Sequence, residues 1–290
     1  MVAAYRGKCM TTGVHNQIVG VCRFSYPGLG GFKASRLDQE ELETLLYDQA
    51  RMNRRFAFFE KLCLPSLAAQ TDMDFRLVVL IGTSMPMRFR KRLKGLAERY
   101  SFLQICALEP NGPLQATRRA FRRGRTDDAD FTTGFRIDDD DAVAVDYIEK
   151  TRAAADQLLR TGWADADNPA VIAFHRGIYW DMTDKDQPFY EFREIGPLGL
   201  ASAMVTKRDA PTNIFRWNHR RLAAHARLWS DPTETMFIRT LHQHNDSGRS
   251  VPPGAVAIAK PKARALMEER FGLDPEEVLP LMWRSSGSNP

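Results

Sequence analysis

One short run of the sequence, FRLVVLI at residues 75–81, restricts the fold more than any other segment. The run is nearly all apolar and rich in β-branched residues, which is typical of a strand that is buried on both faces. Such a strand needs helices on both sides of its sheet. The run therefore predicts an α/β fold in which this strand has parallel neighbours.

The neighbouring segments alternate between strand and helix patterns. Strands are predicted at 18–24, 102–108 and 131–137, and helices at about 37–70, 86–100 and 114–123. Pro65 should kink or break the first of these helices. The alternation favours an open, mixed, mostly parallel sheet with right-handed crossovers. Beyond it we expect a helix at about 142–160 and strands at 170–180 and 199–206, which complete the sheet.

Composition and charge set the general class of protein. The chain has 290 residues, 43% of them hydrophobic, so it can bury a full core. We expect one domain over 1–290, with an N-terminal extension to about residue 16 and a frayed tail from about residue 284. The formal charge of +5 favours anionic partners such as nucleotides, nucleic acid or lipid headgroups.

Targeting signals and cysteine spacing add two expectations. No apolar stretch approaches the roughly 18 residues that span a bilayer, and the first residues lack the apolar run of a secretory signal. A cytoplasmic location is expected, with peripheral contact at the inner face of an anionic membrane as an option. Cys9, Cys22, Cys63 and Cys106 form no CxxC pair, so neither a zinc site nor a disulfide framework is predicted.

Four consecutive carboxylates, Asp138 to Asp141, follow the strand predicted at 131–137. They repel one another, at a cost that grows when they are withdrawn from water, so a cleft that holds them needs a cation. Mg²⁺ or Mn²⁺ suits carboxylate oxygens and leaves positions open for phosphates. In an extended segment Asp138 and Asp140 share a face, with Asp139 on the other. The alternative is that Asp140 or Asp141 only caps the next helix.

Several motifs resemble known families. The segment IDDDDAV after a strand resembles the DxD motif of nucleotide-sugar-dependent glycosyltransferases with the GT-A fold, and FFEKLCLPSLAAQTDMDFRLVVLIG resembles their first helix and second strand. More narrowly, the motifs RFSYPG, LPSLAAQTDMDF, FRIDDDDAV and IRTLHQHNDS are together similar to a bacterial family labelled rhamnosyltransferases. The similarity runs from about Gln17 to Ser250.

The resemblance implies a GT-A-like, Rossmann-like fold with helices on both faces of the sheet, and an enzyme of polysaccharide biosynthesis. It implies transfer of a hexose, with L-rhamnose as one candidate, from a nucleotide-sugar donor to a hydroxyl of a bacterial glycan or glycolipid, with inversion. It places Mn²⁺ or Mg²⁺ on Asp138 and Asp140, with His242 as a further ligand. Asp138 and Asp139 would contact the donor. Whether Asp141 is a ligand or a helix cap stays open.

The donor site has candidate residues at the exit of the first strand. Where many members of the superfamily carry an acidic pair after the second strand, this chain has Gly82-Thr83-Ser84. Arg23, Phe24 and Ser25 would then have to contribute more, with an arginine for phosphate or base and an aromatic ring for stacking. A buried Phe24 and a surface Arg23 are the alternative. Arg118, from an arginine-rich segment, is a further candidate for the diphosphate.

An inverting transfer needs a general base near the acceptor hydroxyl. Asp231 and Glu234 are the candidates, in the segment DPTETMFIR, which also fits a capping box at the start of a helix with Pro at its first position. The superfamily often places its acidic base at the start of a helix with an arginine several residues later, and Arg239 loosely fits. His219 could meet the acceptor or a phosphate.

Two other classes of function compete with this reading. A basic nucleic-acid-binding protein would use the arginine-rich segment, but it leaves Asp138 to Asp141 unexplained, and no nucleic acid is expected as a partner. A metal-dependent nucleotide phosphohydrolase would use the carboxylates and would release phosphate with no acceptor present.

Overall fold

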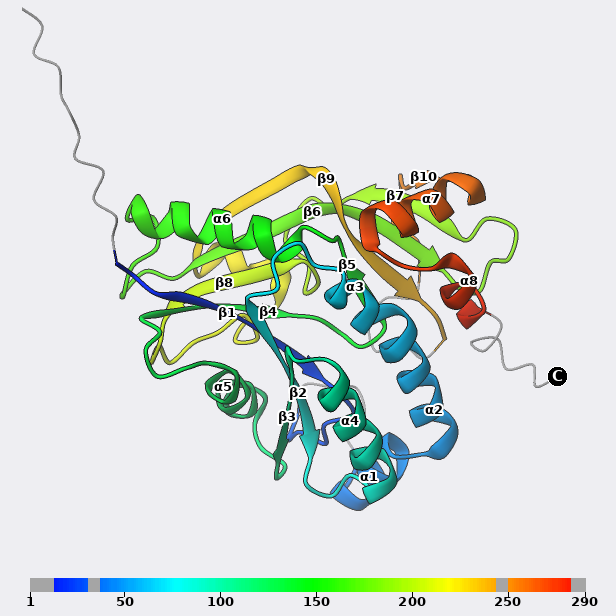
Figure 1. Ribbon diagram of the computed structural model, residues 1–290, viewed down its shortest axis with the longest axis horizontal. Helices are drawn as coiled ribbons and strands as arrows, with labels where there is room; N and C mark the ends of the chain where they lie inside the picture. The colour runs from blue at the N-terminus through cyan, green and yellow to red at the C-terminus, as the bar shows by residue number, and fades with distance from the viewer. Residues whose placement is uncertain (1–12, 31–36, 244–249, 283–290) are drawn as a thin grey trace, which may run out of the picture.

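The computed structural model describes residues 13–30, 37–243 and 250–282. At its centre is a ten-stranded sheet with the order β10-β7-β6-β8-β4-β1-β2-β3, in which β9 pairs with both β6 and β5. Helices lie on both faces of this sheet (Figure 1). The expectation of a mixed α/β sheet flanked by helices is confirmed.

The elements have the following bounds. The strands are β1 (Asn16–Arg23), β2 (Phe75–Gly82), β3 (Leu103–Leu108), β4 (Phe131–Arg136), β5 (Asp141–Val143), β6 (Ala170–Asp181), β7 (Phe189–Arg193), β8 (Ser202–Lys207), β9 (Arg227–Leu241) and β10 (Val256–Ala257). The α-helices are α1 (Gln39–Leu46), α2 (Gln49–Phe58), α3 (Leu64–Ala68), α4 (Met87–Arg99), α5 (Pro113–Gly124), α6 (Tyr147–Arg160), α7 (Lys260–Phe271) and α8 (Pro275–Val278). A π-helix η2 (Phe59–Cys63) and a 3-10 helix η3 (His219–Ala224) complete the set.

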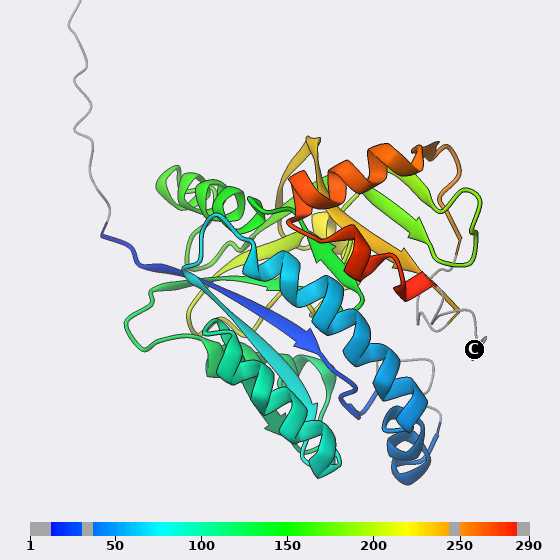
Figure 2. The ribbon, with the colours of Figure 1, turned by 45° about the vertical axis from the view of Figure 1, so that its right-hand side comes forward.

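Strands β3, β2, β1 and β4 form the parallel half of the sheet. Every residue of β2 except Arg76 is buried, as its apolar run predicted. One core lies between this half and helices α2 to α4 and α6, and a second lies under α5 on the opposite face. Figure 2 shows α2 and α3 lying across β1 and β2. This arrangement directs the carboxyl ends of four strands toward one edge.

The other half of the sheet is mostly antiparallel and departs from two expectations. The helix predicted from Asp231 is wrong, because residues 227–241 form the long strand β9, which pairs in parallel with β6. The helix predicted from about 142 begins only at Tyr147. Residues 141–143 are instead drawn into the sheet as β5, antiparallel to β9. In both cases strand pairing with a distant segment overrides a local helix-start pattern.

Pro65 disturbs its helix without ending it. Helix α2 continues through the π-helix η2 into α3, with Pro65 in the first turn of α3. The N–H of Leu64 donates to the carbonyl of Phe59, a π-helical bond five residues back. One extra residue in this turn accommodates a proline, which cannot donate a backbone hydrogen bond.

Some expectations concern residues outside the described ranges. These are Cys9, His244, the first twelve residues of the N-terminal extension and the tail from 284. Cys22, Cys63 and Cys106 are buried free thiols. Among the described residues, no helix combines the length and apolar character needed to cross a membrane.

Candidate active site at the exit of strand β4

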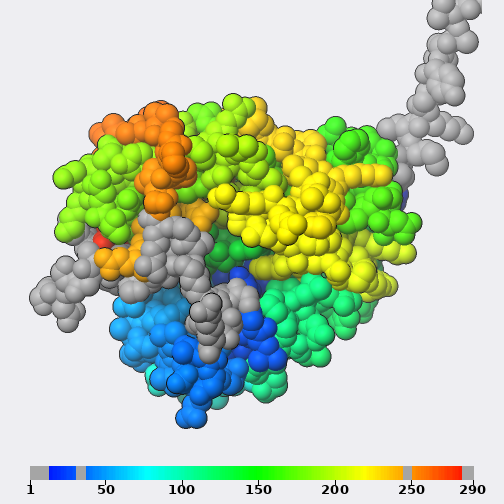
Figure 3. Space-filling model, turned by 180° about the vertical axis from the view of Figure 1, so that it is seen from behind, coloured from blue at the N-terminus to red at the C-terminus, as the bar shows by residue number. Residues whose placement is uncertain are grey.

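The acidic segment leaves the sheet at the carboxyl end of β4 and turns into β5. The N–H of Asp141 donates to the carbonyl of Asp138 at 3.2 Å, which closes the turn. In Figure 3 the colours of this segment and of the end of β1 lie at the bottom of a hollow, beside the yellow segment around residues 210–225. The carboxylates therefore sit where an open α/β sheet binds ligands.

Asp139 forms a buried ion pair with Arg55 of α2. Its side chain is 2% exposed, and Arg55 also donates to the carbonyl of Arg23 at 3.3 Å. Burial raises the pKa of Asp139 to about 7, although the guanidinium of Arg55 opposes this shift. Asp139 thus points toward α2. The segment that carries it is a turn, so the alternation of side chains predicted for an extended segment does not apply here.

Asp140 contacts His242, the predicted metal ligand that lies outside the acidic segment and directly follows β9. Nε2 of His242 lies 2.9 Å from Oδ2 of Asp140, and the imidazole stacks on Phe58 with ring centroids 5.0 Å apart. The hydroxyl of Thr240 donates to the carbonyl of Asp140 at 2.7 Å. Burial alone would raise the pKa of Asp140, but the hydrogen bond with His242 holds it below its usual value. The end of β9 therefore fixes this carboxylate.

Asp138 and Asp141 differ in exposure. Asp138 has a side chain that is 46% exposed, and it lies 3.6 Å from a guanidinium nitrogen of Arg136. Asp141 is buried, and burial together with the neighbouring carboxylates raises its pKa. Neither Asp140 nor Asp141 caps α6, whose N-cap residue is Asp146. The alternative, that Asp140 or Asp141 only caps the next helix, is therefore wrong.

The side chains around Asp140 supply some, but not all, of the ligands that a divalent cation needs. No three acidic, histidine or cysteine side chains within the described residues converge on one point. Asp140 and His242 do meet, and Asp138, two residues before Asp140, has a partly exposed side chain. A carboxylate and an imidazole suit Mn²⁺, and such ions commonly complete their shell with water and phosphate oxygens.

A pocket beside the acidic segment separates the exit of β1 from the first turn of α5. Arg23, Tyr26, Gly28, Pro113 and Thr117 are among its lining residues. The guanidinium of Arg23 lies 5.4 Å from the centroid of the Phe215 ring. This pocket combines an arginine with the N-terminus of a twelve-residue helix, which is a favourable environment for an anion.

The other two residues predicted at the exit of β1 are turned inward. Phe24 has no exposed surface and packs on Phe56 and Phe59, so its predicted stacking on a ligand is wrong. Ser25 is buried with φ of 51°, a strained conformation for a residue other than glycine. Its hydroxyl accepts a hydrogen bond from Arg51 at 2.7 Å. Phe24 and Ser25 therefore belong to the protein core and do not face a ligand.

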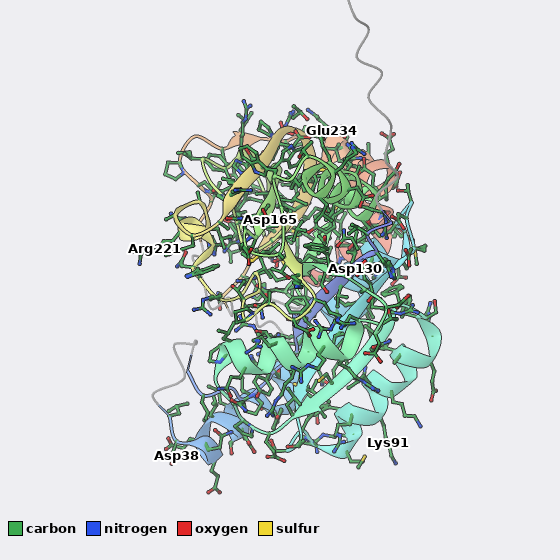
Figure 4. The ribbon with its side chains drawn as sticks, turned by 90° about the vertical axis from the view of Figure 1, so that its left-hand side faces the viewer. Asp38, Lys91, Asp130, Asp165, Arg221 and Glu234 are labelled. Carbon is green, nitrogen blue, oxygen red and sulfur yellow. The ribbon has the colours of Figure 1, made fainter. Side chains whose placement is uncertain are left out.

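Glu234 lies away from the acidic segment. It pairs with Lys150 of α6 at 2.5 Å and with Arg270 of α7 at 3.0 Å, and Figure 4 labels it beside α6. Thr240, which contacts Asp140, is six strand residues further on, roughly 20 Å. Asp231 accepts hydrogen bonds from the N–H and hydroxyl of Thr233. The structure therefore brings neither carboxylate beside Asp140.

The position of Arg118 is also removed from the acidic segment. It lines a separate cleft that includes Thr132 at the start of β4. Because Asp138 follows Thr132 by six residues, most of them in the extended strand β4, the two residues are roughly 20 Å apart.

Four residues near the site were missed by the sequence analysis or given no firm place. Asp141 pairs with Arg239 in the β5–β9 register, and Arg239 pairs with Tyr179 in the β9–β6 register. Glu194 accepts a hydrogen bond from the hydroxyl of Tyr179. His219 lies close enough to Arg136 and Arg239 that burial and these cations lower its pKa to about 4. The sequence analysis could not place Asp141, Arg239 and Tyr179 next to one another, because it predicted a helix where β9 lies.

Carboxylates at the exit of a parallel strand lie where open α/β sheets bind their ligands. Residues 17–253 match the family model described as "Putative rhamnosyl transferase". This match covers most of the chain, so the protein belongs to that family of glycosyltransferases.

Comparison with solved structures gives distant similarities. TarS 1-349 of S. aureus, solved in complex with UDP-GlcNAc, is 14% identical with a TM-score of 0.42 over 83% of this chain and 62% of that one. GalNAc-T7 with UDP, GalNAc and Mn²⁺ is 10% identical with a TM-score of 0.39 over 79% of this chain and 44% of that one. The chain thus spans less than two thirds of either protein. No curated protein matches in sequence.

Proposed function

We propose that the protein transfers a sugar from a nucleotide-sugar donor to an acceptor hydroxyl, using a divalent cation held by Asp140 and His242. The observation that carries this proposal is the 2.9 Å contact between Asp140 and His242 at the carboxyl edge of the sheet. Family membership supports glycosyl transfer. The sugar is a hexose, with L-rhamnose as the first candidate, and the acceptor is a bacterial glycan or glycolipid.

The cation, when bound, would neutralise negative charge on the leaving diphosphate. The protein's own residues prepare this position. The ion pair between Arg55 and Asp139 anchors the acidic segment to α2, and Thr240 and His242 fix Asp140 from β9. Asp138 remains at the cleft surface, where it can reach the cation or the donor.

The diphosphate would lie between Asp138 and the exit of β1. Arg23 and Arg136 both approach the ring of Phe215, at 5.4 and 5.1 Å from its centroid. These two guanidinium groups supply the positive charge that a diphosphate needs on its side away from the cation. The small pocket lined by Arg23, Tyr26 and Thr117 would take a single polar group of the donor.

Glu194, which accepts a hydrogen bond from the hydroxyl of Tyr179, is our candidate for the general base that takes the acceptor proton. Burial alone would lower the pKa of Arg239, but Asp141, Asp138 and Glu194 raise it above its usual value, so this arginine connects Glu194 electrostatically with the acidic segment. In the transfer, the acceptor oxygen bonds to the anomeric carbon, the bond from that carbon to the diphosphate oxygen breaks, and the hydroxyl proton passes to Glu194. Attack opposite to the leaving group inverts the anomeric centre.

The test is a panel of sugar nucleotides screened with and without Mn²⁺ for an increase in melting temperature, followed by a turnover assay. We expect one donor to raise the melting temperature only with the metal present, because a ligand that binds the native state stabilises it. Asp140→Asn should lose this shift and reduce turnover by on the order of a hundredfold or more. Asp156→Asn, at an exposed position on α6, is the matched control.

Three outcomes would contradict the proposal. Full turnover by Asp140→Asn would remove the assigned cation site. Release of phosphate from a nucleotide with no acceptor present would indicate a phosphohydrolase. Binding of DNA or RNA with a steep salt dependence and no metal requirement would favour a nucleic-acid-binding protein.

A further inference from the structure

A second cleft lies on the α5 face of the sheet, near the start of β4. Its polar wall contains four arginines and one acidic residue, and its floor is formed by β4 and β8; the residues used below are Arg118, Arg122, Arg125, Thr132, Arg208 and Asp209. We propose that this cleft, here called the arginine cleft, is a binding site for a phosphate group. Its occupant is distinct from the donor, whose diphosphate belongs at the other end of β4.

The charges in the arginine cleft are only partly compensated by the protein. Arg125 donates to Asp209 at 2.8 Å, and Arg208 lies 3.4 Å from the same carboxylate. Arg118 and Arg122 form no ion pair with any other described residue. The two arginines are one turn apart on α5, and both line the arginine cleft. Two guanidinium groups at this spacing can hold two oxygens of one phosphate.

A buried hydroxyl gives a second, independent indication of a ligand. Thr132 is 5% exposed, and its Oγ1 has no hydrogen-bond partner in the described structure. Thr212, across the cleft, also has a buried Oγ1 without a partner. A buried polar group without a partner costs about 1–3 kcal/mol, so such groups are normally satisfied. A phosphate oxygen in the cleft would accept from these hydroxyls.

The arginine cleft is separate from the proposed donor pocket. That pocket lies at the N-terminal turn of α5, beside Pro113 and Thr117, whereas the cleft lies along the helix from Arg118 onward. Within the cleft, the amide of Asn213 already donates to Thr117 at 3.2 Å. The side chains left for a ligand are therefore the two free arginines and the two hydroxyls. The phosphate could come from a soluble phosphorylated molecule or from a lipid headgroup.

The main experiment uses two double variants of α5 that remove the same charge. Arg118→Gln/Arg122→Gln changes the cleft, and Arg119→Gln/Arg123→Gln changes exposed positions of the same helix that do not line it. Binding of inorganic phosphate to the full chain is measured by calorimetry, with sodium chloride added to equal ionic strength. We expect the cleft variant to bind at least tenfold more weakly than wild type, and the control variant to bind as wild type does.

A single variant tests the hydroxyl. Thr132→Val removes an unpartnered buried group without changing the shape of the side chain, so we expect unchanged or higher thermal stability without phosphate. Phosphate affinity should fall by about fivefold, because one hydrogen bond to a charged group is lost. Lower stability together with unchanged phosphate affinity would show that Thr132 has only a structural role, and would overturn its assignment to the site.

Vesicles identify the source of the phosphate. Co-sedimentation with phosphatidylglycerol vesicles, and not with phosphatidylcholine vesicles, that is lost in the cleft variant alone would support a lipid headgroup. Phosphate binding without such co-sedimentation would support a soluble phosphorylated ligand. The proposal is overturned if wild type does not bind phosphate, or if both double variants lose binding equally. Neither result bears on the cation site, because none of these residues contacts Asp140 or His242.

Discussion

The aspartates at the exit of β4 and the arginines that line the cleft near its start differ in how far the protein compensates their charge. At the exit, Asp138, Asp139 and Asp140 each lie beside a positive or hydrogen-bonding partner supplied by the protein. At the start, Arg118 and Arg122 have no ion-pair partner among the described residues. The comparison shows that clustered charge by itself does not identify a ligand site. The partners that the fold supplies indicate which side chains are held in position and which remain for a ligand.

The largest expected effect is on turnover, and it separates the proposed general base Glu194 from Glu234, which lies away from the acidic segment. Glu194→Gln should reduce turnover by about a hundredfold or more, because a general base contributes about 10²–10⁴. Glu234→Gln is its matched control, and turnover should stay within about twofold, since Glu234 is engaged with Lys150 and Arg270. Equal losses in both variants, measured by steady-state kinetics, would show that the proposed distinction is wrong.

The next effect concerns stability at the exit of β4. Arg55→Met should destabilise the protein by about 3–5 kcal/mol, because it leaves Asp139 buried without its ion-pair partner. Denaturant unfolding measures this change. Arg54→Met on the same helix should cost less than about 1 kcal/mol.

A second substitution sharpens this test. Adding Asp139→Asn to Arg55→Met should restore part of the lost stability, because an amide is cheaper to bury than a carboxylate. If Arg55→Met unfolds at the same denaturant concentration as wild type, the ion pair does not anchor the acidic segment.

The smallest expected effect is on the pH dependence of stability, and it concerns His219, which lies near Arg136 and Arg239. The pKa of His219 is lowered to about 4, so the folded protein keeps it neutral while the unfolded chain binds a proton below about pH 6.5. Stability is therefore lost as the pH falls from about 6.5 to 4. His219→Asn should reduce this loss, so the difference in free energy of unfolding between variant and wild type should shift in favour of the variant as the pH falls. Parallel unfolding midpoints between pH 7 and pH 4 would contradict the assignment.

Local sequence patterns predicted most of the parallel half of the sheet. The apolar run in β2 and the helices before and after it follow from period and composition, which depend on neighbouring residues only. Prediction was poorer where strands pair across long distances. The DPTE segment has the local features of a helix start, yet it lies within β9, because β6 offers a long pairing partner.

The sequence by itself determined that a row of aspartates would leave a buried parallel strand at the ligand-binding edge, because strand burial and side-chain alternation are local properties. Only the tertiary structure decided that Arg55 takes Asp139, that His242 meets Asp140, and that Glu234 is turned to α6 and α7. The first two partners are 84 and 102 residues away along the chain. Charge compensation depends on such distant contacts, which no local pattern contains.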